Sequence, residues 1–379
     1  LDVLGPDYNP GIGIRSFGRD PAIVGRLGAA FICGQEGHGV AACAKHFPGK
    51  GAATIDAHID LPTIRLSRKE LERTHLPPFR EAIRAGVAAV MTSHVLMPAI
   101  DRRAPATFSR RAVHGLLRRR LGYRGLIVSD DLCMGAVSKR LPLGEAAASA
   151  LVAGHDLLIV AHGESLMREA AEAVGLALEG GALPAPERLA SDARLAAFLR
   201  RWSGRPRPKV PLPDDELARR VSRAALEILR VGAVSLPLRW PAWKRPRVLV
   251  VWPDLREVAE RFAFEGGPGE PGARVRARLS RWPAEVAFAA APVSSGRVPA
   301  ALKAAAGRAD IVLFFCFEAR RFPGQRAVLE ALRRVAGAKQ VCLLMRSACD
   351  LDLLAAQTTV LTAHGYRNCQ LDVLVASLR

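Results

Sequence analysis

The feature that most constrains this 379-residue chain is a regular alternation of short apolar runs with longer amphipathic segments through residue 162. The runs are almost continuously apolar, which is typical of strands buried on both faces of a sheet. Strands that alternate with helices form parallel sheets with right-handed crossovers. We expect strands at residues 1–4, 40–44, 87–92, 126–129 and 157–161, with helices at about 21–33, 68–85, 109–121 and 143–153.

Polar residues cluster directly after four of these strands, in the segments KHFPGKG, SHVLMP, SDDLCM and HGES. In a β/α barrel the carboxyl ends of all strands open on one face, where catalytic groups collect. An open doubly wound sheet would gather such groups only at a switch point, so four consecutive strand ends favour the barrel. Only about five of the eight βα units of a barrel are recognisable. We therefore expect a TIM-like (β/α) barrel that lacks its first strands, and a 379-residue fragment of a longer gene product whose remaining units lie upstream of Leu1.

A change of composition predicts a second domain. Residues 203–216, SGRPRPKVPLPDDE, hold four prolines and indicate a semi-rigid connector, which a helix at 215–231 follows. A second α/β pattern, with strands at 248–252, 286–290, 311–315, 341–345 and 360–362, predicts a smaller open parallel sheet with helices on both faces. We predict a catalytic barrel over 1–202, a proline-rich linker and connecting helix over 203–246, and an α/β sandwich domain over 247–379.

The net charge of +19 at pH 7 raises the question of a nucleic-acid partner. The 55 basic side chains are spread over both parts of the chain, with no RNA-binding motif or zinc-finger spacing. A composition rich in Ala and Arg explains the charge more simply, so we expect no specific nucleic-acid partner. No apolar run approaches the roughly 18 residues of a membrane helix, so we expect no membrane span. The seven cysteines have no CxxC spacing, so we expect no metal. The phosphate-binding-loop pattern fails, and no GxGxxG directly follows the strand expected at 248–252, so we expect no nucleotide cofactor.

Three polar motifs could carry chemistry. In KHFPGKG, Lys45 and His46 end a buried strand just before a Pro–Gly turn. Asp56 and His58 are two residues apart, so their side chains point the same way in an extended loop, and the carboxylate can orient the imidazole for proton transfer. In SDDLCM, two carboxylates follow a buried strand, where one could act as a nucleophile or charge stabiliser. The simpler alternatives are a histidine bonded to loop backbone, a surface salt bridge and a helix cap.

Together with RSFG, these segments resemble glycoside hydrolase family 3, and within it the bacterial β-N-acetylglucosaminidase (β-hexosaminidase) branch. Sequences of that branch read approximately LDVN, RSFG, KHFPGHG, DSH and SDDLxM in this order. The present chain reads LDVL, RSFG, KHFPGKG, DAH and SDDLCM. The resemblance covers about residues 1–200 strongly and the second α/β region more loosely. It implies a retaining enzyme that removes terminal β-linked N-acetylglucosamine, in particular from peptidoglycan fragments, without metal or organic cofactor.

The resemblance also implies roles for matching residues. Asp130 corresponds to the nucleophile that forms a covalent glycosyl-enzyme. His58 corresponds to the acid/base residue, with Asp56 as its orienting partner. The positions that hold sugar hydroxyl groups are matched by Arg15, Lys45 and His46.

Alternatives to this interpretation remain open. The Asp-x-His loop is missing from branches that take their acid/base Glu from the second domain, so it favours a hexosaminidase over a β-glucosidase or xylosidase. Lys50 stands where the family usually has a second histidine, which, with the missing strands, favours a noncatalytic carbohydrate-binding relative. A nucleic-acid binder ranks third. We expect a cytoplasmic protein, with export as the alternative, because relatives include both.

Overall fold

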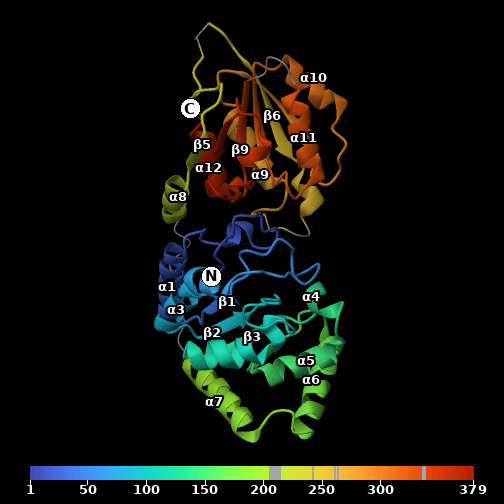
Figure 1. The fold of residues 1–379 in the computed structure, drawn as a ribbon. Helices are drawn as coiled ribbons and strands as arrows, with labels where there is room; N and C mark the ends of the chain where they lie inside the picture. Colours follow the sequence, from blue (N-terminus) through green and yellow to red (C-terminus); the bar gives the residue numbers. More distant parts are fainter. Residues whose placement is uncertain (205–214, 241–242, 260–261, 263, 335–338) are drawn as a thin grey trace. The chain divides into compact units, whose positions relative to one another are not determined.

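The computed structural model describes residues 1–204, 215–240, 243–259, 262, 264–334 and 339–379 (Figure 1). The chain divides into two compact units, Leu1–Val210 and Pro211–Arg379. Most of the connector expected at 203–216 lies outside the described residues. Among the residues that the structure describes, no helix is long and apolar enough to cross a membrane.

The first unit is built on a four-stranded sheet in the order β1-β2-β3-β4. All three neighbouring pairs are parallel, and helical segments occupy the crossovers, as parallel pairing requires. The α/β fold expected for this part of the chain is confirmed. The strands are β1 (Cys43–Phe47), β2 (Ala89–Thr92), β3 (Leu126–Asp131) and β4 (Leu157–Ile159).

Two strand predictions at the start of the chain are wrong in detail. Residues 1–4 form no strand, although three of the four are apolar. They run instead beside the loop after β1, where the Gly5 amide donates to the Gly51 carbonyl at 3.2 Å. The strand expected at 40–44 begins at Cys43, because Val40 still bonds back to the end of helix α1.

The helices of the first unit begin and end at local signals. The Asp20 side chain caps α1 by accepting the amides of Ala22 and Ile23. The helix expected over 68–85 is divided in three. Pro77 and Pro78 lack the amide that would continue the preceding helix, so the third part begins there. The segments are α1 (Pro21–Gly37), α2 (Arg68–Glu70), the π-helical η2 (Leu71–His75), α3 (Pro77–Arg84), the π-helical η4 (Arg111–Arg120), α4 (Gly135–Ser138), α5 (Leu143–Ala153), α6 (Glu164–Glu179) and α7 (Ala185–Trp202), with short turns η1 (Gly13–Arg15) and η3 (Ala106–Phe108).

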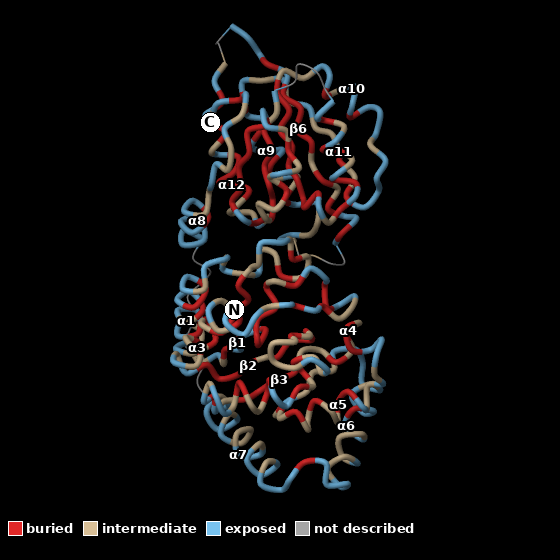
Figure 2. Tube along the Cα trace, viewed as in Figure 1, coloured by how far each residue is buried: buried red, intermediate tan, exposed pale blue. Residues whose placement is uncertain are grey.

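The core of the first unit packs the helices against the sheet. Phe47 on β1 and Phe79 on α3 are fully buried, with ring centroids 5.3 Å apart in an edge-to-face contact. Figure 2 shows buried residues running along the strands of each unit. Burying each large apolar side chain contributes about 1.5–3 kcal/mol, so this packing holds the strand ends in place.

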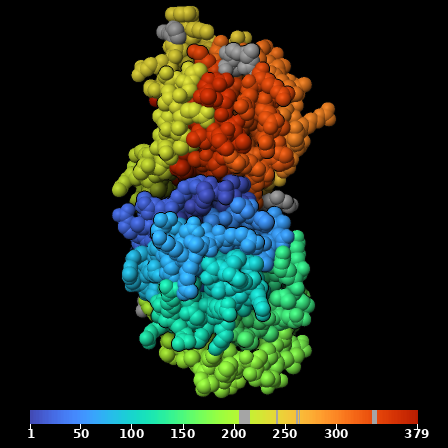
Figure 3. Space-filling view, viewed as in Figure 1, coloured from blue at the N-terminus to red at the C-terminus, as the bar shows by residue number. Residues whose placement is uncertain are grey.

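The second unit contains a six-stranded sheet in the order β5-β10-β9-β8-β6-β7. Five strands are parallel, whereas β5 pairs antiparallel with β10. The helix predicted over 215–231 is therefore wrong at its end: α8 (Asp215–Ala224) stops early and β5 follows. On the surface, α8 lies beside the C-terminal helix α12 (Asn368–Ala376), although the two are far apart in the sequence (Figure 3). The strands are β5 (Glu227–Arg230), β6 (Arg247–Pro253), β7 (Glu285–Ala291), β8 (Ile311–Cys316), β9 (Lys339–Leu344) and β10 (Thr359–Thr362).

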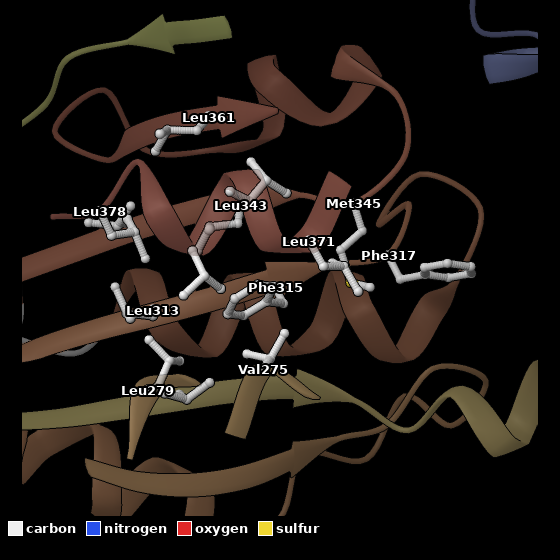
Figure 4. Packing of buried hydrophobic residues seen from close by; sticks show 14 of the residues in the cluster. Val275, Leu279, Leu313, Phe315, Phe317, Leu343, Met345, Leu361, Leu371 and Leu378 are labelled. Carbon is white, nitrogen blue, oxygen red and sulfur yellow. The ribbon is translucent and has the colours of Figure 1, made fainter. Parts of the chain in front are cut away.

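Helices cover both faces of this second sheet. On β8, Leu313 and Phe315 belong to one apolar cluster, whereas Val312 and Phe314 belong to another on the opposite face. Figure 4 shows Leu313 and Phe315 packed with side chains of α9 and α12. The remaining elements are η5 (Leu255–Val258), α9 (Glu270–Leu279), α10 (Ala300–Arg308), α11 (Pro323–Arg333), η6 (Ala348–Leu353) and α12 (Asn368–Ala376).

Candidate active site

The polar motifs of the first unit lie at the carboxyl ends of its parallel strands. His46 lies near the end of β1, His94 follows β2, and Asp130 lies at the end of β3. Because the three strands are parallel neighbours, these ends meet at one edge of the sheet (Figure 1). Among the described residues, no group of three acidic, histidine or cysteine side chains could hold a metal ion at this edge.

Asp130 lies in a largely buried, positively charged setting. Its side chain is 15% exposed, and the Lys50 ammonium lies 3.3 Å from its Oδ2 atom. Its Oδ1 atom accepts the Asp131 amide at 3.1 Å. Burial alone would raise the pKa of Asp130, but Lys50, with smaller contributions from nearby histidines, holds that pKa below its ordinary value. The carboxylate is therefore ionised near neutral pH, as a nucleophile must be.

His46 is buried and oriented by an aspartate near the start of the chain. Its Nδ1 atom lies 2.7 Å from Asp2 Oδ2, and the other Asp2 oxygen accepts the Lys50 amide at 2.6 Å. Burial lowers the pKa of His46, although the Asp2 carboxylate acts to raise it. A neutral ring that donates Nδ1–H to Asp2 keeps an acceptor at Nε2. The sequence reasoning missed Asp2, whose one signal is a single acidic residue within the apolar segment LDVL.

The pair expected from the Asp-x-His spacing forms in the structure. Asp56 Oδ1 lies 2.7 Å from His58 Nδ1 and also accepts the His58 amide at 3.1 Å. The Asp56 side chain is 12% exposed, whereas the His58 imidazole is 61% exposed. The carboxylate thus orients one ring nitrogen and leaves the other for proton transfer.

The loop that carries this pair is joined to the segment after Asp130. The Gly135 amide donates to the His58 carbonyl at 3.2 Å, and the Ala136 amide donates to the Ala57 carbonyl at 3.0 Å. A Cβ atom on Gly135 would lie 2.7 Å from the His58 carbonyl oxygen, so this close approach requires glycine. The structure therefore brings the 56–58 loop against the loop that begins at Asp130. Gly135 was missed by the sequence reasoning, although it directly follows SDDLCM.

The other predicted sugar-binding residues have different surroundings. Arg15 is exposed, and its Nε atom donates to the Gly11 carbonyl at 3.1 Å. A Cβ atom on Gly11 would lie 3.2 Å from Asp56 Oδ1, so Arg15 is anchored to the backbone beside Asp56. Lys45 is exposed whereas the adjacent His46 is buried, so the structure does not give these two neighbours a common environment.

A buried histidine supports the end of β3. His94 is fully buried, with Nδ1 2.8 Å from the Thr107 hydroxyl and Nε2 2.9 Å from the Asp131 carbonyl. Burial lowers the pKa of His94. The Asp131 carboxylate accepts the amides of Cys133 and Ala161, so it braces the loops next to Asp130. No spacing in the sequence identifies His94, because its partners lie on other elements.

The parallel α/β fold places a largely buried carboxylate, Asp130, and an imidazole oriented by a second carboxylate, His58 with Asp56, in loops that contact each other. This arrangement is compatible with glycoside hydrolysis. Residues 1–196 match the family described as "Glycosyl hydrolase family 3 N terminal domain". This match covers more than half of the chain, and the chain belongs to that family.

Relatives and a solved structure agree with the family. Proteins named beta-hexosaminidase from Thiobacillus denitrificans and Neisseria meningitidis are 41% identical over 169 residues and 42% identical over 172 residues. These alignments cover 44% and 45% of this chain and 47% of each relative, so the chain spans about half the length of the curated relatives it matches. The solved family 3 β-N-acetylglucosaminidase from Paenibacillus sp. is 32% identical, with a TM-score of 0.85 over 98% of this chain and 71% of that chain. The family predicted from the motifs is confirmed.

Proposed function

We propose that this chain carries the catalytic apparatus of a retaining exo-β-N-acetylglucosaminidase, acting on terminal β-linked N-acetylglucosamine of peptidoglycan fragments. One observation carries the proposal: Gly135 and Ala136 bond to the carbonyls of His58 and Ala57, which keeps an oriented imidazole at the loop that begins at Asp130. The names of the relatives support the choice of sugar.

The proposed reaction has two steps that balance in protons and charge. In the first, the Asp130 carboxylate attacks the anomeric carbon, the bond to the leaving oxygen breaks, and His58 gives that oxygen its proton. In the second, His58 takes a proton from water, the water oxygen attacks the anomeric carbon, and Asp130 leaves as a carboxylate. Arg15, Lys45 and His46 would hold sugar hydroxyl groups. The reaction requires no metal and no organic cofactor.

The direct test is hydrolysis of 4-nitrophenyl N-acetyl-β-glucosaminide by the wild-type chain and by Asp130→Asn. We expect wild-type turnover, and a loss of at least about a thousandfold in the variant, because removing a nucleophile removes the covalent route. The matched control is Asp192→Asn, which changes an exposed carboxylate on α7. A loss below about tenfold for Asp130→Asn would contradict the assignment. Faster hydrolysis of the corresponding β-glucoside would identify a β-glucosidase instead.

A noncatalytic carbohydrate-binding protein is the second candidate. The Lys50–Asp130 ion pair favours it, because a paired carboxylate is a weaker nucleophile. Calorimetric binding of N-acetylglucosamine without any hydrolysis of the aryl substrate would support this candidate.

A further inference from the structure

Lys50 is buried and held rigidly at the nucleophile. Its side chain is 5% exposed, unusually low for lysine, and its ammonium lies 3.3 Å from Asp130 Oδ2. The Lys50 backbone is fixed at both ends, because its amide donates to Asp2 and its carbonyl accepts from Asn9 at 2.8 Å. Lys50 therefore reaches Asp130 from an anchored loop.

The loop conformation requires the glycine that precedes Lys50. Gly49 has a φ of +108°, which side-chain-bearing residues rarely adopt. A Cβ atom there would also lie 3.0 Å from the ring of His75, which is buried beneath the loop. The conformation of Gly49, the backbone bonds to Asp2 and Asn9, and the ion pair with Asp130 thus hold the Lys50 ammonium in one position.

The basic side chains around Asp130 differ in the charge that they carry near neutral pH. From the neighbouring elements, Lys50, His46 and His94 act on its carboxylate, and the Asp131 carboxylate lies beyond it in the chain. Burial lowers the pKa of both histidines, so they are neutral near pH 7. Of these three side chains, Lys50 is therefore the one that carries a full positive charge near pH 7.

We propose that Lys50 is a positioning residue that makes Asp130 a better leaving group and so speeds breakdown of the glycosyl-enzyme. This inference rests on the proposed function. The free carboxylate carries a full negative charge, the two transition states carry part of it, and the glycosyl ester carries none. A fixed cation therefore stabilises the free carboxylate most and the ester least. It slows attack by Asp130 on the sugar and accelerates its departure when water attacks.

The kinetic test compares Lys50→Met and Lys50→Arg on 2,4-dinitrophenyl N-acetyl-β-glucosaminide. This leaving group needs little protonation, so breakdown of the glycosyl-enzyme limits turnover. For Lys50→Met we expect a burst of about one dinitrophenolate per enzyme, a kcat lower by at least about tenfold, and a kcat/KM that is unchanged or higher, because attack by Asp130 is no longer slowed. Lys50→Arg keeps the charge and should retain kcat within about threefold of wild type. Lys69→Met, on the exposed face of α2, is the control for lost charge alone.

An equal fall in kcat and kcat/KM without a burst would overturn the proposal, because Lys50 would then serve sugar binding or the first step. A kcat within about twofold of wild type in Lys50→Met would overturn it as well.

A second measurement needs no turnover. Titration of the Asp130 carboxyl carbon by ¹³C NMR should show its pKa rising by at least about one unit in Lys50→Met, and unchanged in Lys69→Met. The acid limb of kcat/KM should move up in pH by the same amount. If the pKa of Asp130 is the same in Lys50→Met as in the wild type, the role of Lys50 is refuted, whatever activity the variant has. Absence of hydrolysis by the wild-type chain would refute the proposed function and leave this titration as the test of the ion pair.

Discussion

Asp56 holds His58 through one carboxylate oxygen that receives both the ring Nδ1 and the backbone amide. The two bonds have separate consequences: the ring bond selects the nitrogen available for proton transfer, and the backbone bond sets the turn of the loop. Because Asp56 is nearly buried and the imidazole is exposed, the aspartate determines the orientation of a ring that solvent would otherwise leave free.

Replacing Asp56 by Asn tests this arrangement at the scale of one residue. The amide keeps the size of the side chain but removes the charge that stabilises a protonated imidazole. We expect kcat/KM for N,N′-diacetylchitobiose, a substrate with a poor leaving group, to fall by about 10²-fold, while kcat/KM for the dinitrophenyl substrate falls less than about threefold. Asp60→Asn, in the same loop but paired with Arg140, is the matched control. An equal loss on both substrates would mean that Asp56 only maintains the loop.

At the scale of elements, the site depends on contacts between loops that follow different strands. The 56–58 loop comes after β1, and the segment 135–136 begins α4 after β3. Their two backbone hydrogen bonds, with an apolar contact of Ala57, Met134 and Ala136, join the loops. The position of His58, the proposed acid–base residue, therefore depends on the backbone of the element that follows Asp130 in the chain.

Gly135→Ala should disturb this junction. The added Cβ would lie 2.6 Å from the Ile59 carbonyl oxygen and 2.7 Å from that of His58, so the loop has to move away. We expect kcat/KM for the aryl substrate to fall by at least about tenfold, since misplaced catalytic groups are costly. The matched control is Gly175→Ala in α6, where a Cβ meets nothing within 4 Å and should raise stability by about 0.5–1 kcal/mol. Unchanged kcat/KM in Gly135→Ala would show that the junction is not needed.

At the scale of the whole molecule, the buried titratable groups of the two units differ in kind. Among the described residues of the first unit, four histidines are buried, and burial lowers the pKa of each of them: His46, His75, His94 and His155. In the second unit, burial instead raises the pKa of Glu318 and Asp350. The two units should therefore respond to acid with opposite sign.

We expect acid to destabilise the first unit selectively. Burial lowers the pKa of His155 to about 4, against an ordinary value of 6.5. Between these values the unfolded chain binds a proton that the folded unit excludes, so stability is full above pH 6.5 and falls as the pH drops towards 4. At pH 5, His155 alone should cost about 2 kcal/mol. The raised pKa values of Glu318 and Asp350 give the second unit stability at low pH that is lost as the pH rises.

Hydrogen exchange measured by mass spectrometry at pH 7.5 and 5.0, corrected for intrinsic rates, follows both units at once. Protection of β2 and β3 should fall at pH 5.0, while protection of β8 and β9 should hold or increase. His155→Gln should reduce the loss in the first unit, and His38→Gln, at an exposed position, should not. Equal losses in both units would contradict the expected difference.

Local patterns suffice for much of this fold. Helix α5 spans the predicted 143–153, and β2, β3 and β8 lie where the apolar runs predict them, because burial on both faces leaves a continuous apolar signal. The Asp56–His58 pair is equally local, since two residues of one loop form it. Ordered motifs such as KHFPGKG and SDDLCM were enough to predict the family.

Contacts between distant segments decided the rest. Residues 1–4 are mostly apolar, yet they run beside a loop. Residues 227–230 form the strand β5 because β10, far along the chain, offers an edge with which they pair. Asp2 beside His46, Gly135 beside His58 and Lys50 against Asp130 leave no periodic trace in the sequence. A periodic pattern reports which face of an element is buried, whereas these pairings arise only when separate elements pack together, and that packing determines the charge and the geometry at the candidate active site.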